Sequence, residues 1–144
     1  MQLQKLPYIA HGWGLTILGD NLVANRPQAW KYGPVYPELY ESLRRYGAGN
    51  VTDLIHEDDD DPFSEDRGPV VTAELSDNER RLIDAVWDSY RNYNGVALSM
   101  MTHREGTPWT IVYNRDGNRA VIPNDLIAQH YNQIAAERRK GEKS

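Results

Sequence analysis

The amino-acid sequence predicts a mainly α-helical, compact single-domain fold with a small β-hairpin or short strands. Apolar residues recur at steps of three and four along much of the chain, which places them on one face of a helix. The length of 144 residues, 40% of them hydrophobic, suits one hydrophobic core. No cysteine is present, so no disulfide contributes to the fold. The domain is expected to cover residues 1–137, and a short basic tail, 138–144, follows it.

The first helix is expected to begin at about residue 5 or 6 and to end at Gly19. Pro7 is compatible with this start, because proline is tolerated in the first turn of a helix. Gly12 and Gly14 lie inside the helix and do not follow a strand, so they indicate close packing and not a phosphate-binding loop. A short extended segment, 21–25, comes next. The apolar face of the helix is expected to consist of Leu6, Ile9, Trp13 and Ile17.

The segment 29–37 contains two prolines and one glycine, which predicts a rigid, turning connection. Pro37 then opens a second helix, which Gly47 ends. Two short strands beyond it, 51–56 and 70–74, can pair as a hairpin on either side of an acidic loop at about 57–68.

Ser76 and Glu79 have the spacing of a capping box, in which each residue bonds the backbone of the other at the start of a helix. The helix that they begin has an apolar stripe that ends at Tyr90. A further helix is expected from Asn94 or Gly95 to about His103.

Two alternatives stay open for residues 107–122. Thr107 and Pro108 are suited to begin a short helix, whereas Asp116-Gly117 is suited to the turn of a hairpin between 111–113 and 119–122. In either case Pro123 opens the last helix.

The charged residues are unevenly distributed. The formal net charge is −5, but the acidic loop accounts for it and the rest of the chain is close to neutral. No basic stripe is present, which argues against a nucleic-acid-binding protein, and the basic tail is interpreted as a solvated end. No stretch approaches the roughly 18 apolar residues that span a membrane, and no secretory signal is recognisable. We therefore expect a cytoplasmic protein that does not associate with membranes.

No residue pattern has the spacing of a catalytic or metal-binding motif. The acidic residues after His56 are consecutive, whereas a calcium loop needs alternating oxygen ligands and a glycine bend. His103 and Glu105, alone or with His11, lack the spacing of a helical ligand pair, and no serine stands in a nucleophile elbow. We expect no enzymatic activity, no cofactor and no metal. A metal-dependent enzyme that uses His103 and Glu105 is the weaker alternative.

The sequence contains nine tyrosines and four tryptophans but only one phenylalanine. Both types combine a large apolar body with a polar group, which suits cores and protein interfaces. The tryptophans, Trp13, Trp30, Trp87 and Trp109, are expected in the core. The second helix has more tyrosines than one buried stripe can hold, with two arginines among them. An exposed, partner-binding Tyr/Arg surface is therefore predicted from Tyr36, Tyr40, Arg44, Arg45 and Tyr46.

Four segments, in order, resemble the Panacea, or SocA-like, antitoxin domain family. The most distinctive is the run 29–35, with Pro37 and Tyr40 behind it. The first segment consists of Lys5, Leu6, Tyr8, Ala10, Gly12 and Trp13. The third includes Leu75, Ser76, Trp87, Tyr90, Leu98, Thr102, His103, Glu105, Pro108 and Trp109, and the fourth is 122–127. Together they extend from residue 5 to about residue 131.

The resemblance implies a helical domain with small β elements that neutralises a cognate toxin by direct binding, in bacteria or their phages. One branch is similar to a proteolytic adaptor that delivers its toxin to a ClpXP-type protease. No catalytic residue is implied. The motif residues Trp13, Trp30, Gly33, Pro34, His103, Glu105, Pro108 and Trp109 are expected to define the fold, and variable surface positions are expected to contact the toxin.

Members of the family usually have a further helix before the first segment, whereas this sequence begins almost at it. A phage-encoded inhibitor of a host or defence protein, built on the same domain, is therefore retained as the alternative. Whether the protein forms a homo-oligomer stays open.

Overall fold

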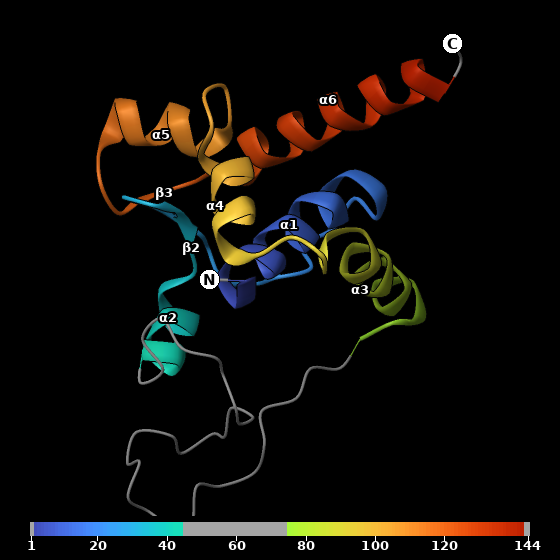
Figure 1. The fold of residues 1–144 in the computed structure, drawn as a ribbon, viewed down its shortest axis with the longest axis horizontal. Coiled ribbons are helices and arrows are strands. Elements are labelled where there is room, and N and C mark those ends of the chain that lie inside the picture. The colour runs from blue at the N-terminus through green and yellow to red at the C-terminus, as the bar shows by residue number, and fades with distance from the viewer. Residues whose placement is uncertain (1, 45–74, 143–144) are drawn as a thin grey trace, which may run out of the picture.

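The computed structural model describes residues 2–44 and 75–142 (Figure 1). Six helices and three short strands occur in these two ranges. In chain order they are α1 (Gln2–Ile17), β1 (Gln28–Trp30), β2 (Gly33–Val35), α2 (Pro37–Leu43), α3 (Asp77–Tyr90), α4 (Gly95–His103), α5 (Pro108–Asp116), β3 (Ala120–Val121) and α6 (Asn124–Glu142). The mainly α-helical fold class predicted from the sequence is confirmed.

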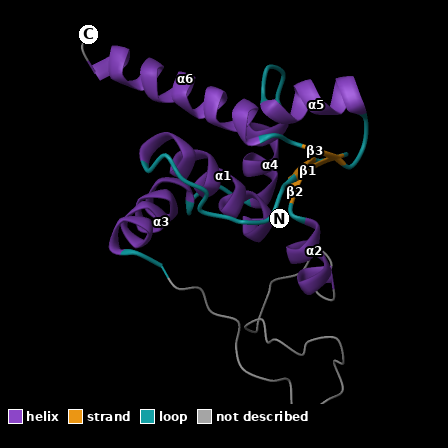
Figure 2. Cartoon of the chain, turned by 180° about the vertical axis from the view of Figure 1, so that it is seen from behind, coloured by secondary structure: helices purple, strands orange, loops and turns teal. Residues whose placement is uncertain are grey.

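α1 lies at the centre of the molecule, in contact with α3, α4, α6 and β2 (Figures 1 and 2). Residues 8–14 of α1 are buried without interruption. That pattern is typical of a helix surrounded by other elements, and not of a surface helix with one apolar stripe. Ile17, predicted to belong to the buried face, is 62% exposed because it stands at the end of the helix.

The start of α1 differs from the prediction. The helix begins at Gln2, and Pro7 therefore lies inside it and not in its first turn. Proline has no N–H to donate to the carbonyl of Leu3, so one helical hydrogen bond is missing. Tertiary contacts compensate, because the side chains of Gln4 and Lys5 are buried and bond the backbone that follows β1.

Gly12 provides the close packing expected of it. A Cβ atom at Gly12 would lie 2.2 Å from the ring of Tyr131, which belongs to α6. The absence of a side chain thus lets the Tyr131 ring lie directly against the backbone of α1. Trp13 packs edge-on against the same ring, with 5.2 Å between ring centroids.

The three strands form an antiparallel sheet of order β2-β1-β3. Ala29, in the central strand, pairs with Pro34 of β2 and with Ala120 of β3. The segment predicted as a turning connection is therefore a tight hairpin, closed by Lys31 and Tyr32. This sheet is the small β element of the described part.

The segment 21–25, predicted to be extended, is a loop and not a strand, and β1 begins only at Gln28. Side chains hold the loop. The amide of Val23 donates to Nδ1 of His11 (3.2 Å), and Asn124 Nδ2 donates to Asn21 Oδ1 (2.7 Å). The loop thus bonds α1 and the start of α6, and not a neighbouring strand.

The helix starts of the second half follow the sequence closely. Ser76 and Glu79 form the predicted capping box of α3, and Asn94 caps α4. Between α4 and α6 the helical alternative is correct: Thr107 caps α5 and Pro108 is its first residue. The hairpin alternative is wrong, because residues 120–121 pair with β1 and not with 111–113.

The C-terminal helix is longer than expected. α6 continues to Glu142, so most of the predicted basic tail is helical, and its end projects away from the other elements (Figure 1). The predicted end of the second helix at Gly47, the strands 51–56 and 70–74, and the acidic loop lie outside the described residues. None of the helices in the described ranges is long and apolar enough to cross a membrane.

Candidate functional site

The hairpin β1–β2 is held by side chains from three helices. Ser99 Oγ, on α4, donates to the carbonyl of Tyr32 (2.6 Å), and Trp109 Nε1, on α5, donates to the carbonyl of Trp30 (2.6 Å). From α1, Lys5 Nζ donates to the carbonyl of Pro34 (2.6 Å). Buried backbone carbonyls need such partners, so the hairpin depends on these three side chains.

Gly33 is required by both conformation and space. Its φ of +122° lies in the region that side chains rarely adopt. A Cβ atom there would also lie 3.1 Å from Nζ of Lys5. The run 29–35 and Lys5, which belong to different segments of the predicted family motif, are therefore in direct contact.

Lys5 is a buried cation. Its side chain is almost inaccessible to solvent, and within residues 2–44 and 75–142 no ion pair joins it to a carboxylate. Burial lowers the pKa of the Lys5 ammonium to about 8, because the charged form loses its hydration. Burial also raises the pKa values of the hydroxyls of Tyr8 and Tyr36.

The described residues of the predicted Tyr/Arg surface divide between core and surface. Tyr36 is 3% exposed and belongs to the core, because its backbone N–H bonds Gln4 Oε1 (3.1 Å) and turns the residue inward. Tyr40, on α2, and Arg44, the C-cap residue of α2, are exposed and stand about one helical turn apart. Arg45 and Tyr46 lie outside the described residues.

Two residues that the sequence did not suggest for this surface extend it. The ring of Trp30 meets the ring of Tyr40 edge-on, with 4.9 Å between centroids, and the guanidinium carbon of Arg119 lies 4.5 Å from the Trp30 ring centroid. We call the set of partly buried Trp30 and exposed Tyr40, Arg44 and Arg119 the hairpin surface. Sequence alone gave no signal for Arg119, since only the pairing of β3 with β1 brings it there.

Arg119 is held in a strained backbone conformation. Its φ of +69° is left-handed, which is uncommon for a residue other than glycine. The amide of Arg119 donates to the carbonyl of Ala29 (2.6 Å), and this bond fixes the turn into β3. The side chain is consequently directed over the Trp30 ring.

The tryptophans divide between core and surface. Trp13 and Trp109 are buried as expected, and Trp30 is partly buried. Trp87 is 52% exposed, so its assignment to the core is wrong. Its neighbour Val86 takes the buried position on α3.

His103 and Glu105 do not form an acid–base pair, since no hydrogen bond joins them. The Nδ1 of His103 contacts Ser99 Oγ (3.2 Å), its ring packs edge-on against Trp109, and Glu105 is exposed. Both ring nitrogens of His11 are bonded, to the Val23 amide and to Asn124 Oδ1. In the described ranges no three His, Asp or Glu side chains are grouped so that they could hold a metal ion.

Comparison with known proteins agrees with the arrangement around the hairpin. The family model described as "Antitoxin SocA-like, Panacea domain" matches residues 3–110, which include nearly all of α1, the hairpin, α4 and the first residues of α5. Antitoxin SocA of Caulobacter vibrioides (strain NA1000 / CB15N) is 28% identical over 117 residues, which cover 81% of this chain and 61% of the relative. The chain thus spans about three fifths of the length of that relative. No solved structure matches the chain. Since the family model covers most of the sequence, the chain belongs to the Antitoxin SocA-like, Panacea domain family.

Proposed function

We propose that the protein is an antitoxin that neutralises a cognate toxin by direct protein–protein binding, and that the hairpin surface makes the contact. Family membership supports the antitoxin role. The observation that supports the contact site is the grouping of exposed Tyr40 and Arg119 around the partly buried Trp30. Tryptophan, tyrosine and arginine are the residue types that contribute most to binding energy at protein interfaces.

The electrostatics of the hairpin surface indicate an acidic patch on the toxin. Arg119 has no carboxylate partner among the described residues, and Arg44 has only an exposed contact with Glu41 at 3.7 Å. An exposed pair of this kind contributes little, so Arg44 is free to exchange its partner. An aromatic pair with Arg119 over one ring, and with Arg44 four residues after Tyr40, suits a surface with apolar side chains surrounded by carboxylates.

The test is co-expression in a bacterial host. Genes that neighbour the gene of this protein are expressed singly, and one of them is expected to arrest growth. Co-expression of this protein should restore growth, and the two proteins should copurify without any change in the covalent structure of the toxin. If no neighbouring gene is harmful alone, or if growth is restored without a complex, the antitoxin proposal is wrong.

A proteolytic adaptor role is a more specific form of the same proposal. It predicts that the toxin is degraded faster in the presence of this protein and a ClpXP-type protease, whereas simple neutralisation leaves the lifetime of the toxin unchanged. A pulse–chase measurement of the toxin in cells with and without the protease distinguishes the two.

A further inference from the structure

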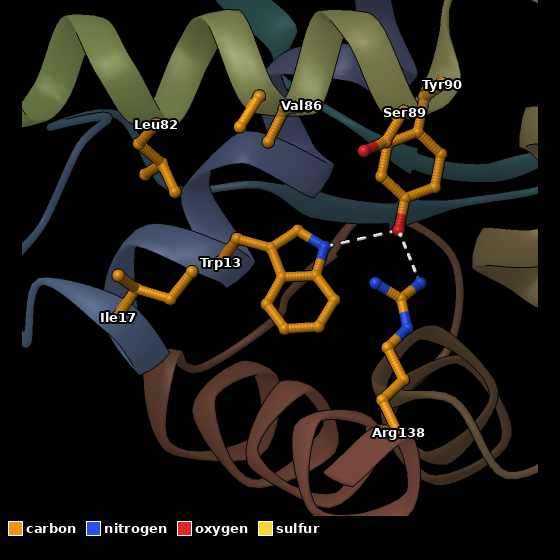
Figure 3. Close-up of a pocket in the computed structure, with 8 residues that line it drawn as sticks. Trp13, Ile17, Leu82, Val86, Ser89, Tyr90 and Arg138 are labelled. Carbon is orange, nitrogen blue, oxygen red and sulfur yellow. Dashed lines mark hydrogen bonds between the residues drawn. The ribbon is translucent and has the colours of Figure 1, made fainter. Parts of the chain in front are cut away.

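A second site lies at the far end of α1 from the hairpin. A hollow of about 150 Å³ opens between the end of α1, the middle of α3 and the last turns of α6 (Figure 3). Its floor consists of the buried side chains of Trp13, Leu82 and Val86, and exposed Ile17 and Ser89 stand on its rim. An apolar cavity of about this volume accommodates a benzene-sized molecule, so the hollow has room for one large apolar side chain.

Three polar side chains meet at the hollow, and two of them donate to the third. The hydroxyl oxygen of Tyr90 accepts from Trp13 Nε1 (3.2 Å) and from Arg138 Nη2 (3.4 Å) (Figure 3). The hydroxyl hydrogen of Tyr90 donates to none of the described residues, although the side chain is buried. The Tyr90 side chain lines the hollow, so an acceptor bound there can take the hydroxyl hydrogen.

Arg138 supplies a cation at the same place. Its guanidinium carbon lies 5.0 Å from the Trp13 ring centroid, at the edge of the hollow. Among the described side chains of residues 2–44 and 75–141, no carboxylate lies within 4.0 Å of it. On α6, Arg138 occupies the next inward position after Tyr131 and Ile134, where the helix leaves the rest of the molecule. Its side chain is therefore directed back toward Trp13 while its charge stays exposed to solvent.

We propose that this hollow binds the C-terminal residue of a protein partner, with a large aliphatic side chain in the hollow and the terminal carboxylate bonded to Arg138 and Tyr90. The Arg138 guanidinium carbon lies 5.0 Å from the Trp13 ring centroid in the floor of the hollow. This short separation favours a C-terminal residue as the occupant. In a C-terminal residue the side chain and the carboxylate branch from the same carbon atom, whereas an internal acidic residue carries its carboxylate on a neighbouring side chain.

This site is independent of the toxin contact proposed above. Lys5, beneath the hairpin, and Ile17, on the rim of the hollow, are twelve residues apart on α1, or about 18 Å at 1.5 Å per residue. A partner at the hollow therefore leaves the hairpin surface accessible, and the protein can hold two partners at once.

The test uses the full-length protein and three hexapeptides in NMR titrations. The first is Gly-Ser-Gly-Ser-Gly-Leu with a free carboxyl end, the second is the same peptide amidated, and the third is amidated Gly-Ser-Leu-Asp-Gly-Ser. The free-acid peptide should shift the Trp13 indole signal and the amide signals of Ala85 and Ser89. It should bind about tenfold more tightly than its amide, because a charge-assisted bond to Arg138 is lost.

Two variants separate charge from shape. Arg138→Gln should reduce binding of the free-acid peptide to that of the amidated one, and Ala85→Phe, which fills the hollow from its rim, should abolish binding of both. Arg139→Gln, one residue along the same helix with its side chain on the Ala135 carbonyl, is the matched control and should leave the affinity unchanged. Equal affinity of the acid and amide peptides, tighter binding of the Leu-Asp peptide, or no shift at the hollow would each overturn the proposal. None of these outcomes bears on growth rescue by the hairpin surface.

Discussion

At the scale of single residues, the positions that matter most are those where an ordinary side chain would not fit. Gly12 packs against Tyr131 and Gly33 against Lys5. Among the described residues, the hydrogen-bond partner of the buried Lys5 is the backbone carbonyl of Pro34. The sequence indicated the close packing of Gly12 from its place inside a helical pattern. It did not indicate that Lys5 is buried, because lysine is almost always at the surface.

Replacement of Gly12 by alanine should destabilise the protein. A Cβ at 2.2 Å from the Tyr131 ring forces α1 and α6 apart, at a cost of about 2–3 kcal/mol that exceeds the ~1 kcal/mol gain in helix propensity. Gly14→Ala is the control, since its Cβ would meet Leu22 Cβ at 3.2 Å and Leu82 at 3.5 Å. Urea unfolding should show a clearly lower free energy of unfolding for Gly12→Ala only. Equal effects of the two changes would mean that the Tyr131 contact is not limiting.

Lys5 should make stability depend on pH in the mildly alkaline range. Below pH 8 the ammonium is charged in both states, so the folded protein bears the full cost of burying it. Above pH 8 the folded state releases the proton while the unfolded state, with a pKa of about 10.4, keeps it. The unfolded state then binds more protons, so the free energy of unfolding rises with pH.

The measurement compares the wild-type protein with Lys5→Met, which has no group that titrates at this position. Between pH 7 and 9.5 the free energy of unfolding of the wild type should rise by about 2 kcal/mol relative to the variant. Titration of the tyrosines affects both proteins and cancels in the difference. A difference that stays flat across this range would show that the Lys5 ammonium is hydrated.

At the scale of elements, the sequence was informative wherever a structure is encoded locally. The capping box at Ser76, the Asn94 cap and the proline at the start of α5 give the helix boundaries of the second half. The hairpin 28–35 and its third strand depend on contacts between distant segments. Ala120 pairs with Ala29 across most of the chain, and no local pattern predicts such a pairing.

In the candidate site too, locally encoded features could be predicted and those that depend on distant segments could not. Tyr40 and Arg44 could be predicted, since they lie one turn apart on a helix with an evident start. Arg119 could not, because it reaches Trp30 only through the sheet. Tyr36 was misplaced because the residue before a helix can turn to either side, and the Gln4 bond to its amide determines which.

The hairpin should loosen when one of its side-chain bonds is removed. Ser99→Ala leaves the carbonyl of Tyr32, whose bond to Ser99 is partly buried, without its 2.6 Å donor, which should cost about 1 kcal/mol. Hydrogen exchange of the amides in residues 28–35 should accelerate more than exchange in α3. Ser89→Ala, at an exposed serine for which the structure shows no hydrogen bond, is the control and should leave exchange of the hairpin unchanged. Uniform acceleration throughout the protein would contradict a specific effect on the hairpin.

At the scale of the whole molecule, α1 connects the hairpin and the surroundings of Trp13. The N-terminal half of this helix bonds the hairpin through Gln4 and Lys5, and the C-terminal half forms the floor of the hollow with α3 and α6. The family match covers this arrangement as far as α5. A buried central helix makes the two surfaces parts of one rigid body, so that mutations on one surface are expected to leave the other intact.

The central claim is that the hairpin surface binds the toxin, and calorimetric titration of the purified toxin tests it most directly. The double variant Tyr40→Ala/Arg119→Glu keeps a non-glycine residue at the left-handed position and should weaken binding at least ~30-fold, as expected for two interface hot spots. Trp87→Ala/Arg80→Glu, an exposed aromatic and an exposed arginine on α3, is the matched control and should bind within about twofold of the wild type. Unchanged affinity of the Tyr40/Arg119 variant, with the control also unchanged, would show that the toxin binds elsewhere on the molecule.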